Sequence, residues 1–275
     1  MGLRINTNLA SLAVQRQISL TQRQSEGAMK SLASGNRFDN PNESSAEHAI
    51  AEELRGQITG VKAGQKNAEN AQSFIQVAEG GLNEQNNILI RMRELAVQAA
   101  SDTFSDKERG FLNSEFTQLQ QEVDRIAQTT QFGSQKLLSG NSKTYEFQVG
   151  AYGGPENIIK YKTETNTRAS ALNVDGLDVE SISGARDSLK TLDEALNTVS
   201  GARASFGAIQ SRLDSTISHS SLQTENLQAA HSRIADTDVA QATSQMYRSQ
   251  ALQQYQISVL NEANRFPGSV IRLVG

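Results

Sequence analysis

The stretch SSAEHAIAEELRGQITGVKAGQKNAENAQSFIQVAEGGLNEQNNILIRMRELAVQAA, residues 44–100, carries the strongest structural signal in the chain. Its apolar residues recur at steps of three and four, or sums of these, which is typical of one face of a helix in a coiled coil. Ser44 and Glu47 have the spacing of a capping box and predict the helix start. About 55 residues at 1.5 Å each make a rod of about 80 Å. The apolar positions are Ile50, Leu54, Ile58, Val61, Ala68, Ile75, Ala78, Leu82, Leu89 and Ala96.

The same spacing predicts further helices on both sides of this rod. One spans about 8–32, with Asn6, Thr7 or Asn8 as its cap, and another follows the capping box of Ser105 and Glu108 to about residue 129. Helical spacing resumes at residue 183, and Asp238 and Gln241 cap a last helix. Residues 145–150 and 158–163 flank the turn sequence AYGGPEN and predict a β-hairpin. The predicted fold is therefore mainly α, with long antiparallel coiled-coil or bundle rods and a small β-hairpin region.

Two glycine patterns lie inside the long rod. Gly56, Gly60 and Gly64 recur every fourth residue, and we interpret this stripe as a site of close helix–helix approach. Gly80 and Gly81 predict either a bend or a close contact, because glycine in a helix interior costs about 1 kcal/mol relative to alanine.

Composition excludes several classes of function. The 275 residues include no cysteine, which removes disulfides and thiolate zinc sites, and a net charge of −4 argues against a nucleic-acid surface. No apolar run approaches the ~20 residues that span a bilayer. His48, His219 and His231 form no metal-binding pattern, and no catalytic or cofactor-binding group is indicated, so we expect no enzyme, cofactor, metal or membrane insertion. The first residues read as mature sequence rather than as a signal peptide.

Both ends of the chain carry apolar stripes. A lone amphipathic helix at a terminus frays in water, so the simplest arrangement pairs the two ends with each other and with copies of the chain. We therefore expect a discontinuous terminal coiled-coil domain, residues 1–43 plus 231–275, and a core helical domain, residues 44–230. The expected packing residues of the terminal domain are Ile5, Leu9, Leu12, Leu20, Met246, Leu252, Val259 and Leu260.

Several separate motifs resemble bacterial flagellin in family order across nearly the whole chain. They are INTNLASL (5–12), SGNRF (34–38), RMRELAVQAASDTFSDKER (91–109), EVDRIAQTTQFGSQKLL (122–138), FQVG (147–150), DGLDV (175–179) and the specific C-terminal stretch 232–273. The resemblance implies a structural subunit that self-assembles into the extracellular helical flagellar filament used for motility. The terminal domain would form an inner tube and the core domain an outer tube.

The resemblance also implies partners: a flagellar export chaperone, hook-associated proteins and cap proteins, together with many copies of the chain itself. Two positions of this sequence depart from the family pattern. Only residues 163–182 stand where many flagellins insert outer domains, so we expect a nearly smooth filament. Glu47 and His48 replace residues that are usually small or apolar, so the packing of the connector is expected to differ.

Many flagellins are bound by an innate immune receptor on the core-helix face. Arg91, Leu95 and Glu115 match residues of that contact, whereas Ile90 stands where the family usually has glutamine. The alternative interpretation, which we favour, is that these residues serve subunit packing.

Two other functions remain open at this point. A hook–filament junction protein has similar ends but is present in few copies and does not propagate into long polymers. A soluble helical binding module or enzyme would be a stable monomer with ordered ends. The matches at RELAVQA (93–99) and SRIADTD (232–238) favour the filament subunit.

Overall fold

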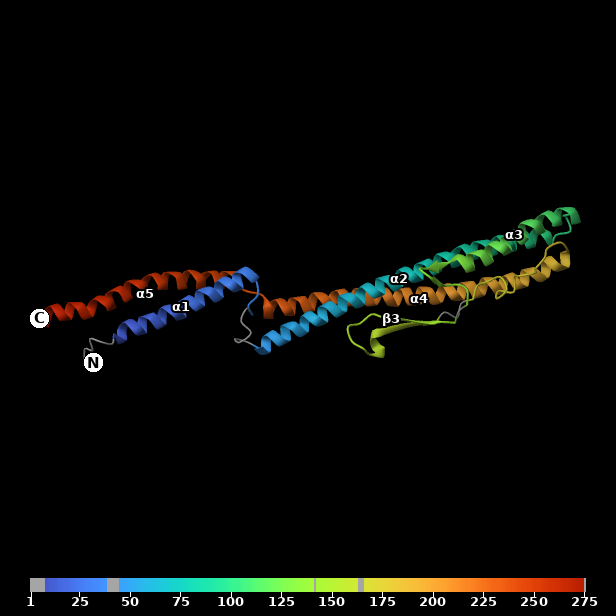
Figure 1. Ribbon diagram of the computed structural model, residues 1–275. Helices are drawn as coiled ribbons and strands as arrows, with labels where there is room; N and C mark the ends of the chain where they lie inside the picture. Colours follow the sequence, from blue (N-terminus) through green and yellow to red (C-terminus); the bar gives the residue numbers. More distant parts are fainter. Residues whose placement is uncertain (1–7, 39–44, 141, 163–165, 275) are drawn as a thin grey trace. The chain divides into compact units, whose positions relative to one another are not determined.

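The computed structural model describes residues 8–38, 45–140, 142–162 and 166–274, with side chains in the last helix described up to residue 265. Five helices dominate these residues (Figure 1). They are α1 (Leu9–Ser34), α2 (Ser45–Ala99), α3 (Asp106–Thr129), α4 (Ile182–Ala235) and α5 (Val239–Val274). The predicted mainly helical fold is confirmed, and the long rod has the expected length of 55 residues.

The helix starts follow the predicted capping chemistry wherever the structure describes it. Asn8 accepts a hydrogen bond from the Ser11 backbone N–H and caps α1. Ser105 and Glu108 form the reciprocal capping box of α3, and Asp238 accepts from the backbone N–H groups of Ala240 and Gln241 at the start of α5. Ser44 lies outside the described residues.

The chain folds into two compact units. The first contains residues 1–56 and 226–275, in which α1 and α5 lie side by side. The second contains residues 57–225 and holds α3, most of α2 and most of α4. We call these the terminal unit and the core unit.

The core unit has an apolar interior. From Val61 to Ala96, the apolar positions that the sequence spacing selected on α2 are buried, and they pack with α3, α4 and the loops between them. The largest fully buried side chains include Phe116, Phe206 and Leu82. Helical spacing therefore identified the buried face of α2 correctly in this unit.

Two small antiparallel hairpins accompany the helices. The predicted hairpin is confirmed: β3 (Thr144–Gln148) pairs with β4 (Ile158–Lys162), with Phe147 opposite Ile159. A second hairpin, β1 (Gln131–Phe132) with β2 (Gln135–Lys136), was not predicted from the sequence. Its signal is the short turn Gly133–Ser134, in which Gly133 has the positive φ of 61° that favours glycine.

The glycine stripe of α2 has a different neighbour from the one predicted. A side chain at Gly60 would clash with Ala151, and a side chain at Gly64 would clash with the backbone of Val149. The stripe therefore receives the chain that follows β3, not another helix, and the helix–helix interpretation is wrong. Nothing lies within 4 Å of the position where a Cβ would stand at Gly56. Gly81 makes the close contact that the sequence allowed, against Thr130 and Leu138.

Glu47 and His48, which depart from the family pattern at the start of α2, contact the residues that follow α1. Glu47 forms an ion pair of 2.5 Å with Arg37, and the His48 ring meets the Phe38 ring edge-on at 6.2 Å. The Arg37 guanidinium also lies 5.1 Å from the centre of the Phe38 ring. These contacts join the start of α2 to Arg37 and Phe38, and the expected difference in connector packing stays a prediction. Pro41, the connector proline, lies outside the described residues.

Candidate functional site

The paired helices α1 and α5 form the candidate site, and their mutual face on α1 is small and polar. The buried residues of α1 are Ser11, Thr21 and Ser25. Val14, Ile18, Ala28 and Leu32 are partly buried on the same face. Together these seven residues step by three and four without interruption, which is the heptad spacing of a coiled-coil seam. We call this face, with its counterpart on α5, the polar seam.

The counterpart on α5 has the same spacing and a similar character. It consists of the buried Ser249 and the partly buried Ala242, Met246, Gln253, Gln256, Leu260 and Ala263. Only two of these seven residues, Met246 and Leu260, have large apolar side chains. A seam of this composition buries little apolar area and stabilises the pair weakly.

Hydrogen bonds hold the pair together at three levels. At the connector end, Asn36 and Asp236 form an isolated antiparallel bridge, in which Arg37 N–H donates to Ala235 O at 2.7 Å. In the middle, Gln256 Nε2 donates to Thr21 Oγ1 at 2.9 Å. At the other end, Asn8 Nδ2 donates to Ala263 O at 2.8 Å. These bonds hold the two helices together, and none of them involves a large apolar side chain.

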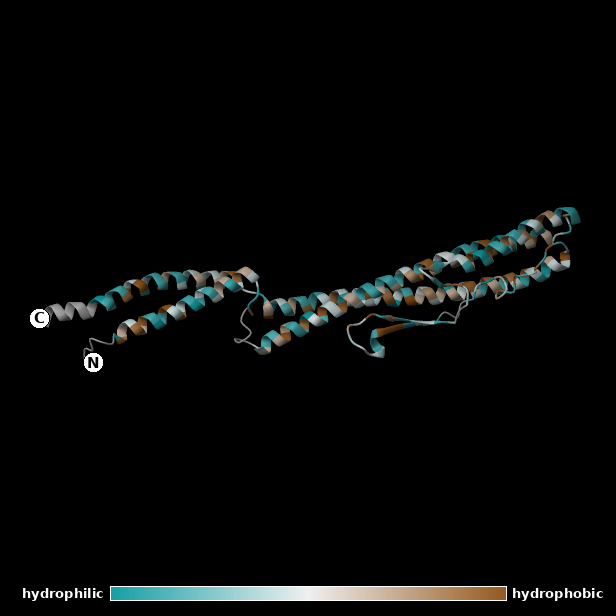
Figure 2. Cartoon of the chain, viewed as in Figure 1, coloured by the Kyte–Doolittle hydropathy of each residue, from teal (hydrophilic) through white to brown (hydrophobic). Residues whose placement is uncertain are grey.

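The large apolar side chains of the pair point away from the seam. On α1, Leu9 is 64% exposed, and Leu12 and Leu20 are each 47% exposed. On α5, Leu252, Tyr255 and Val259 step by three and four along one face and are 45%, 73% and 54% exposed. We call these six residues the outer stripes. Figure 2 shows hydrophobic and hydrophilic residues interleaved along both helices.

The predicted packing residues of the terminal domain therefore fall into three groups. Met246 and Leu260 lie on the polar seam, between the paired helices. Leu9, Leu12, Leu20, Leu252 and Val259 lie on the outer stripes and touch solvent in a single chain. Ile5 lies outside the described residues. Leu9, Leu12 and Leu20 of α1 thus lie outside the seam with α5, whereas Met246 and Leu260 of α5 lie on it.

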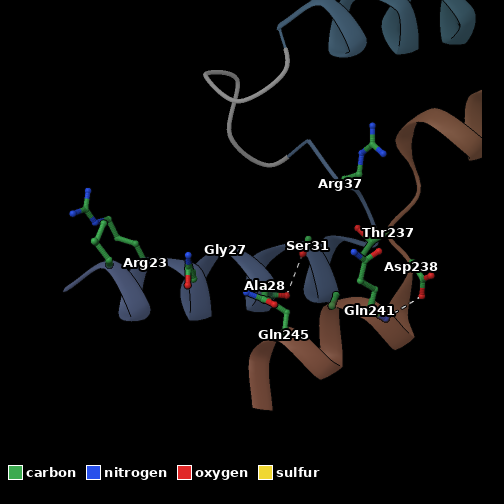
Figure 3. Close-up of a pocket in the computed structure, with 12 residues that line it drawn as sticks. Arg23, Gly27, Ala28, Ser31, Arg37, Thr237, Asp238, Gln241 and Gln245 are labelled. Carbon is green, nitrogen blue, oxygen red and sulfur yellow. Dashed lines mark hydrogen bonds between the residues drawn. The ribbon is translucent and has the colours of Figure 1, made fainter. Parts of the chain in front are cut away.

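A hollow of 590 Å³ lies beside the seam near the connector. Small residues of α1, namely Gly27, Ala28 and Ser31, face Gln241 and Gln245 of α5 here (Figure 3). The Ser31 hydroxyl donates to the backbone carbonyl of Ala28, and Asp238 accepts from the backbone of Gln241. The pair by itself leaves this space unfilled.

The second predicted contact face lies in the core unit. Arg91 is half-exposed and forms ion pairs with Glu115 at 2.9 Å and with Glu94 at 3.1 Å. The hydrogen bond with Glu115 is the main reason that the pKa of Arg91 is raised. Leu95 is 1% exposed and belongs to the core, so its side chain is not presented at the surface of a single chain. Ile90, by contrast, is 44% exposed.

Three buried polar side chains of the core unit were not singled out from the sequence. Arg109 is 4% exposed and donates to the backbone carbonyls of Ala99, Phe104 and Ser101, so it holds the turn between α2 and α3. Gln85 donates to the carbonyls of Val123 and Thr167, and Gln120 donates to those of Val174 and Leu177. Because their partners are backbone carbonyls, no side-chain pattern marks them.

Chemistry other than packing has little support in the described parts of the chain. They contain no cluster of three or more histidine, aspartate or glutamate side chains arranged to hold a metal ion. Among the described helices, none is both long and apolar enough to cross a bilayer. The distinctive feature that remains is a helix pair whose most buried side chains are serine and threonine, while large apolar side chains such as Leu9 and Tyr255 are exposed.

Comparison with known proteins places this feature in a family. Residues 5–143 match the bacterial flagellin N-terminal helical region, and residues 189–274 match the bacterial flagellin C-terminal helical region. A flagellin of Halalkalibacterium halodurans is 38% identical over 270 residues, covering 98% of this chain and 99% of the relative. A flagellin of Bacillus subtilis is 35% identical, covering 99% and 100%. The crystal structure of a Bacillus cereus flagellin aligns with a TM-score of 0.51 and 28% identity, over 60% of this chain and 94% of that one.

Proposed function

Because the chain belongs to the bacterial flagellin family, and is thereby a structural subunit of the flagellar filament, we propose that its copies pack together through the outer stripes of α1 and α5. In this proposal the terminal unit forms the inner layer of the filament and the core unit the layer around it. The filament is extracellular and serves motility.

One observation carries the proposal. The α1–α5 pair hides serine, threonine and glutamine in its seam and leaves Leu9, Leu12 and Tyr255 in solvent. Exposed apolar residues that step along a helix face gain free energy only when another surface covers them, at about 25 cal/mol per Å². In a polymer of identical chains, the covering surface is the same pair in neighbouring copies.

The Arg91–Glu115 face of the core unit is a second packing surface in this proposal. Both side chains are 46% exposed, so neighbouring copies can reach them. Leu95 is buried within the chain, so this surface consists of Arg91 and Glu115 without it.

The family also supports a set of partners that handle the chain before and during assembly. We include a flagellar export chaperone, hook-associated proteins and cap proteins among them. A chain without cysteine suits export in an unfolded state, since it has no thiols to cross-link in transit.

The test is polymerisation on short filament seeds, followed by electron microscopy. The full chain is expected to extend the seeds into long tubes, and deletion of residues 1–33 or 235–275 to abolish extension. A truncated chain that still extends the seeds would overturn the proposed role of the terminal pair.

The same experiment distinguishes a hook–filament junction protein. Such a protein would add a few copies at the seed end and then stop. Two curated relatives that match nearly end to end, from Halalkalibacterium halodurans and Bacillus subtilis, are both flagellins, which favours the propagating subunit.

A further inference from the structure

The hydrogen bond between Gln256 and Thr21 joins two residues that are 235 positions apart in the sequence. Thr21 is 2% exposed, and the Gln256 amide oxygen is also buried. Because Thr21 is buried and Gln256 is partly buried, water competes with this bond less than with a bond at the surface. It is the seam's only side-chain to side-chain hydrogen bond between α1 and α5 within the described residues.

The direction of this bond is fixed by the rest of the site. Thr21 has one hydroxyl proton, and it donates that proton to the carbonyl of Gln17 at 2.9 Å. Thr21 Oγ1 can therefore only accept from Gln256, which must present its Nε2. The Gln256 Oε1 atom is then left buried without a partner among the described residues. A leucine at this position would avoid that cost, so stability alone does not explain a glutamine here.

The glutamine at 256 is explained by the register of the pair, that is, by which residues of α5 lie opposite which residues of α1. If α5 slid along α1 by one heptad, about 10 Å, Gln256 would face Val14 or Ala28 instead of Thr21. Neither side chain can accept a hydrogen bond, so the amide would be buried with no partner at all. Half of the other seam residues are serine or alanine, and these small side chains tolerate such a slide in several positions. The mid-seam glutamine thus favours one register in the middle of the pair, far from the backbone bonds that Arg37 and Thr237 make at the connector end.

We propose that Gln256, through Thr21, sets the register of α5 against α1 and thereby fixes where the two outer stripes stand relative to each other in the filament. The inference rests on the proposed function, because the stripes must align with those of neighbouring copies. In this role Gln256 favours one arrangement at some expense in stability, as single polar residues do in coiled coils.

The experiment measures register inside assembled filaments. The chain has no cysteine, so Gln22→Cys and Gln254→Cys, both at exposed positions, give two unique sites for spin labels. Labelled chains are diluted among unlabelled full-length chains and polymerised on seeds, and pulsed electron resonance gives the distance between the labels. The comparison is between this labelled chain, its Gln256→Leu form and its Gln253→Leu form. Gln253 is a matched control on the same seam, with no side-chain hydrogen bond within the described residues.

The labelled chain and the Gln253→Leu form are expected to give one distance. The Gln256→Leu form is expected to give an additional population displaced by up to about 10 Å, roughly tenfold more abundant than in the control, with unchanged or raised thermal stability. A single unshifted distance in the Gln256→Leu form would overturn the proposal, and so would equal broadening in the Gln253→Leu form.

A variant that removes the acceptor keeps the test decisive if Gln256→Leu does not assemble. Thr21→Val has nearly the same shape but cannot accept, and it is expected to give the same second distance, whereas Thr21→Ser is not. If even the labelled chain without seam substitutions fails to enter filaments, the proposed function itself fails. If that chain enters filaments and Thr21→Val leaves the distance unchanged, only the register proposal fails.

Discussion

The terminal unit and the core unit are built from the same kind of helix but place their apolar residues on opposite sides. In the core unit, Phe116, Phe206 and Leu82 are fully buried between helices. In the terminal unit, Ser11, Thr21 and Ser249 are buried, while Leu9 and Tyr255 are exposed. The core unit buries a large apolar interior within one chain, whereas the terminal unit leaves most of its large apolar stripe residues exposed. We propose that this exposed face of the terminal unit is what neighbouring copies cover.

The largest expected effect is on the stability of the core unit. Phe116→Ala removes a fully buried ring from α3 and is expected to lower the free energy of unfolding by about 3–5 kcal/mol. Phe111 on the same helix is 67% exposed, so Phe111→Ala is expected to change the free energy of unfolding by less than about 0.5 kcal/mol. Denaturant unfolding of the unpolymerised chain measures both. Equal effects would show that α3 is not packed as described.

The next effect comes from the buried arginine of the core unit. Arg109→Met keeps the length of the side chain but removes the donors to three backbone carbonyls in the α2–α3 turn. Because these carbonyls would then lack a hydrogen-bond donor, we expect the free energy of unfolding to fall by about 2–3 kcal/mol. Within the described residues, Arg125 on the same helix pairs with the partly exposed Glu122, and Arg125→Met serves as the control with an expected loss below about 1 kcal/mol. If Arg125→Met lowered the free energy of unfolding more than Arg109→Met, Arg109 would not be the residue that stabilises the turn.

The third prediction separates assembly from folding. Leu12→Gln combined with Leu252→Gln is expected to leave the unfolding free energy of the core unit unchanged, because both residues are nearly half-exposed and lie in the terminal unit. Fully covering an exposed leucine contributes about 1.5–3 kcal/mol, and these two are about half-exposed, so each substitution is expected to raise the critical concentration for polymerisation by roughly three- to tenfold. Light scattering and sedimentation measure it. An unchanged critical concentration would remove these residues from the interface.

The smallest expected effect is on the stability of α3 at low pH. The hydrogen bonds of Ser105 to Glu108 lower the pKa of this carboxyl below its ordinary 4.5. Since the pKa is lower in the folded chain, the ionised cap stabilises α3 fully above about pH 4.5, and this contribution is lost as the pH falls through the lowered pKa. Glu108→Gln is expected to be slightly less stable than the unsubstituted chain at neutral pH, with the difference shrinking in acid. If the difference in stability between the two chains grew as the pH fell, the ionised Glu108 would not be stabilising α3.

Sequence reasoning succeeded where burial happens within one chain. The spacing of Val61, Leu82 and Leu89 on α2 identified the buried face, and the capping box at Ser105 gave the start of α3. Both signals are local, and both depend on a preference that the chain satisfies by itself.

The features that the sequence did not predict have a common physical cause: the residue that makes the contact lies far away in the sequence or in another chain. Leu9, Leu12 and Leu20 follow a helical pattern, but local sequence does not distinguish a partner in α5 from a partner in another copy of the chain. The glycines at 60 and 64 leave room for backbone that lies more than 80 residues later, and Gln85 bonds to the carbonyl of Thr167, 82 residues away. A polar seam such as that of α1 would be found by testing for heptads of small residues as well as large apolar ones.

Amide hydrogen exchange, compared between the unpolymerised chain and the filament, tests most directly whether the terminal pair is completed only by its neighbours. The account predicts that peptides from α1 and α5 exchange rapidly in the unpolymerised chain and gain strong protection in the filament. Peptides around Phe116 and Leu82 are expected to be protected in both states. Terminal helices that are already as protected as the core unit before polymerisation, and gain nothing from it, would contradict the account.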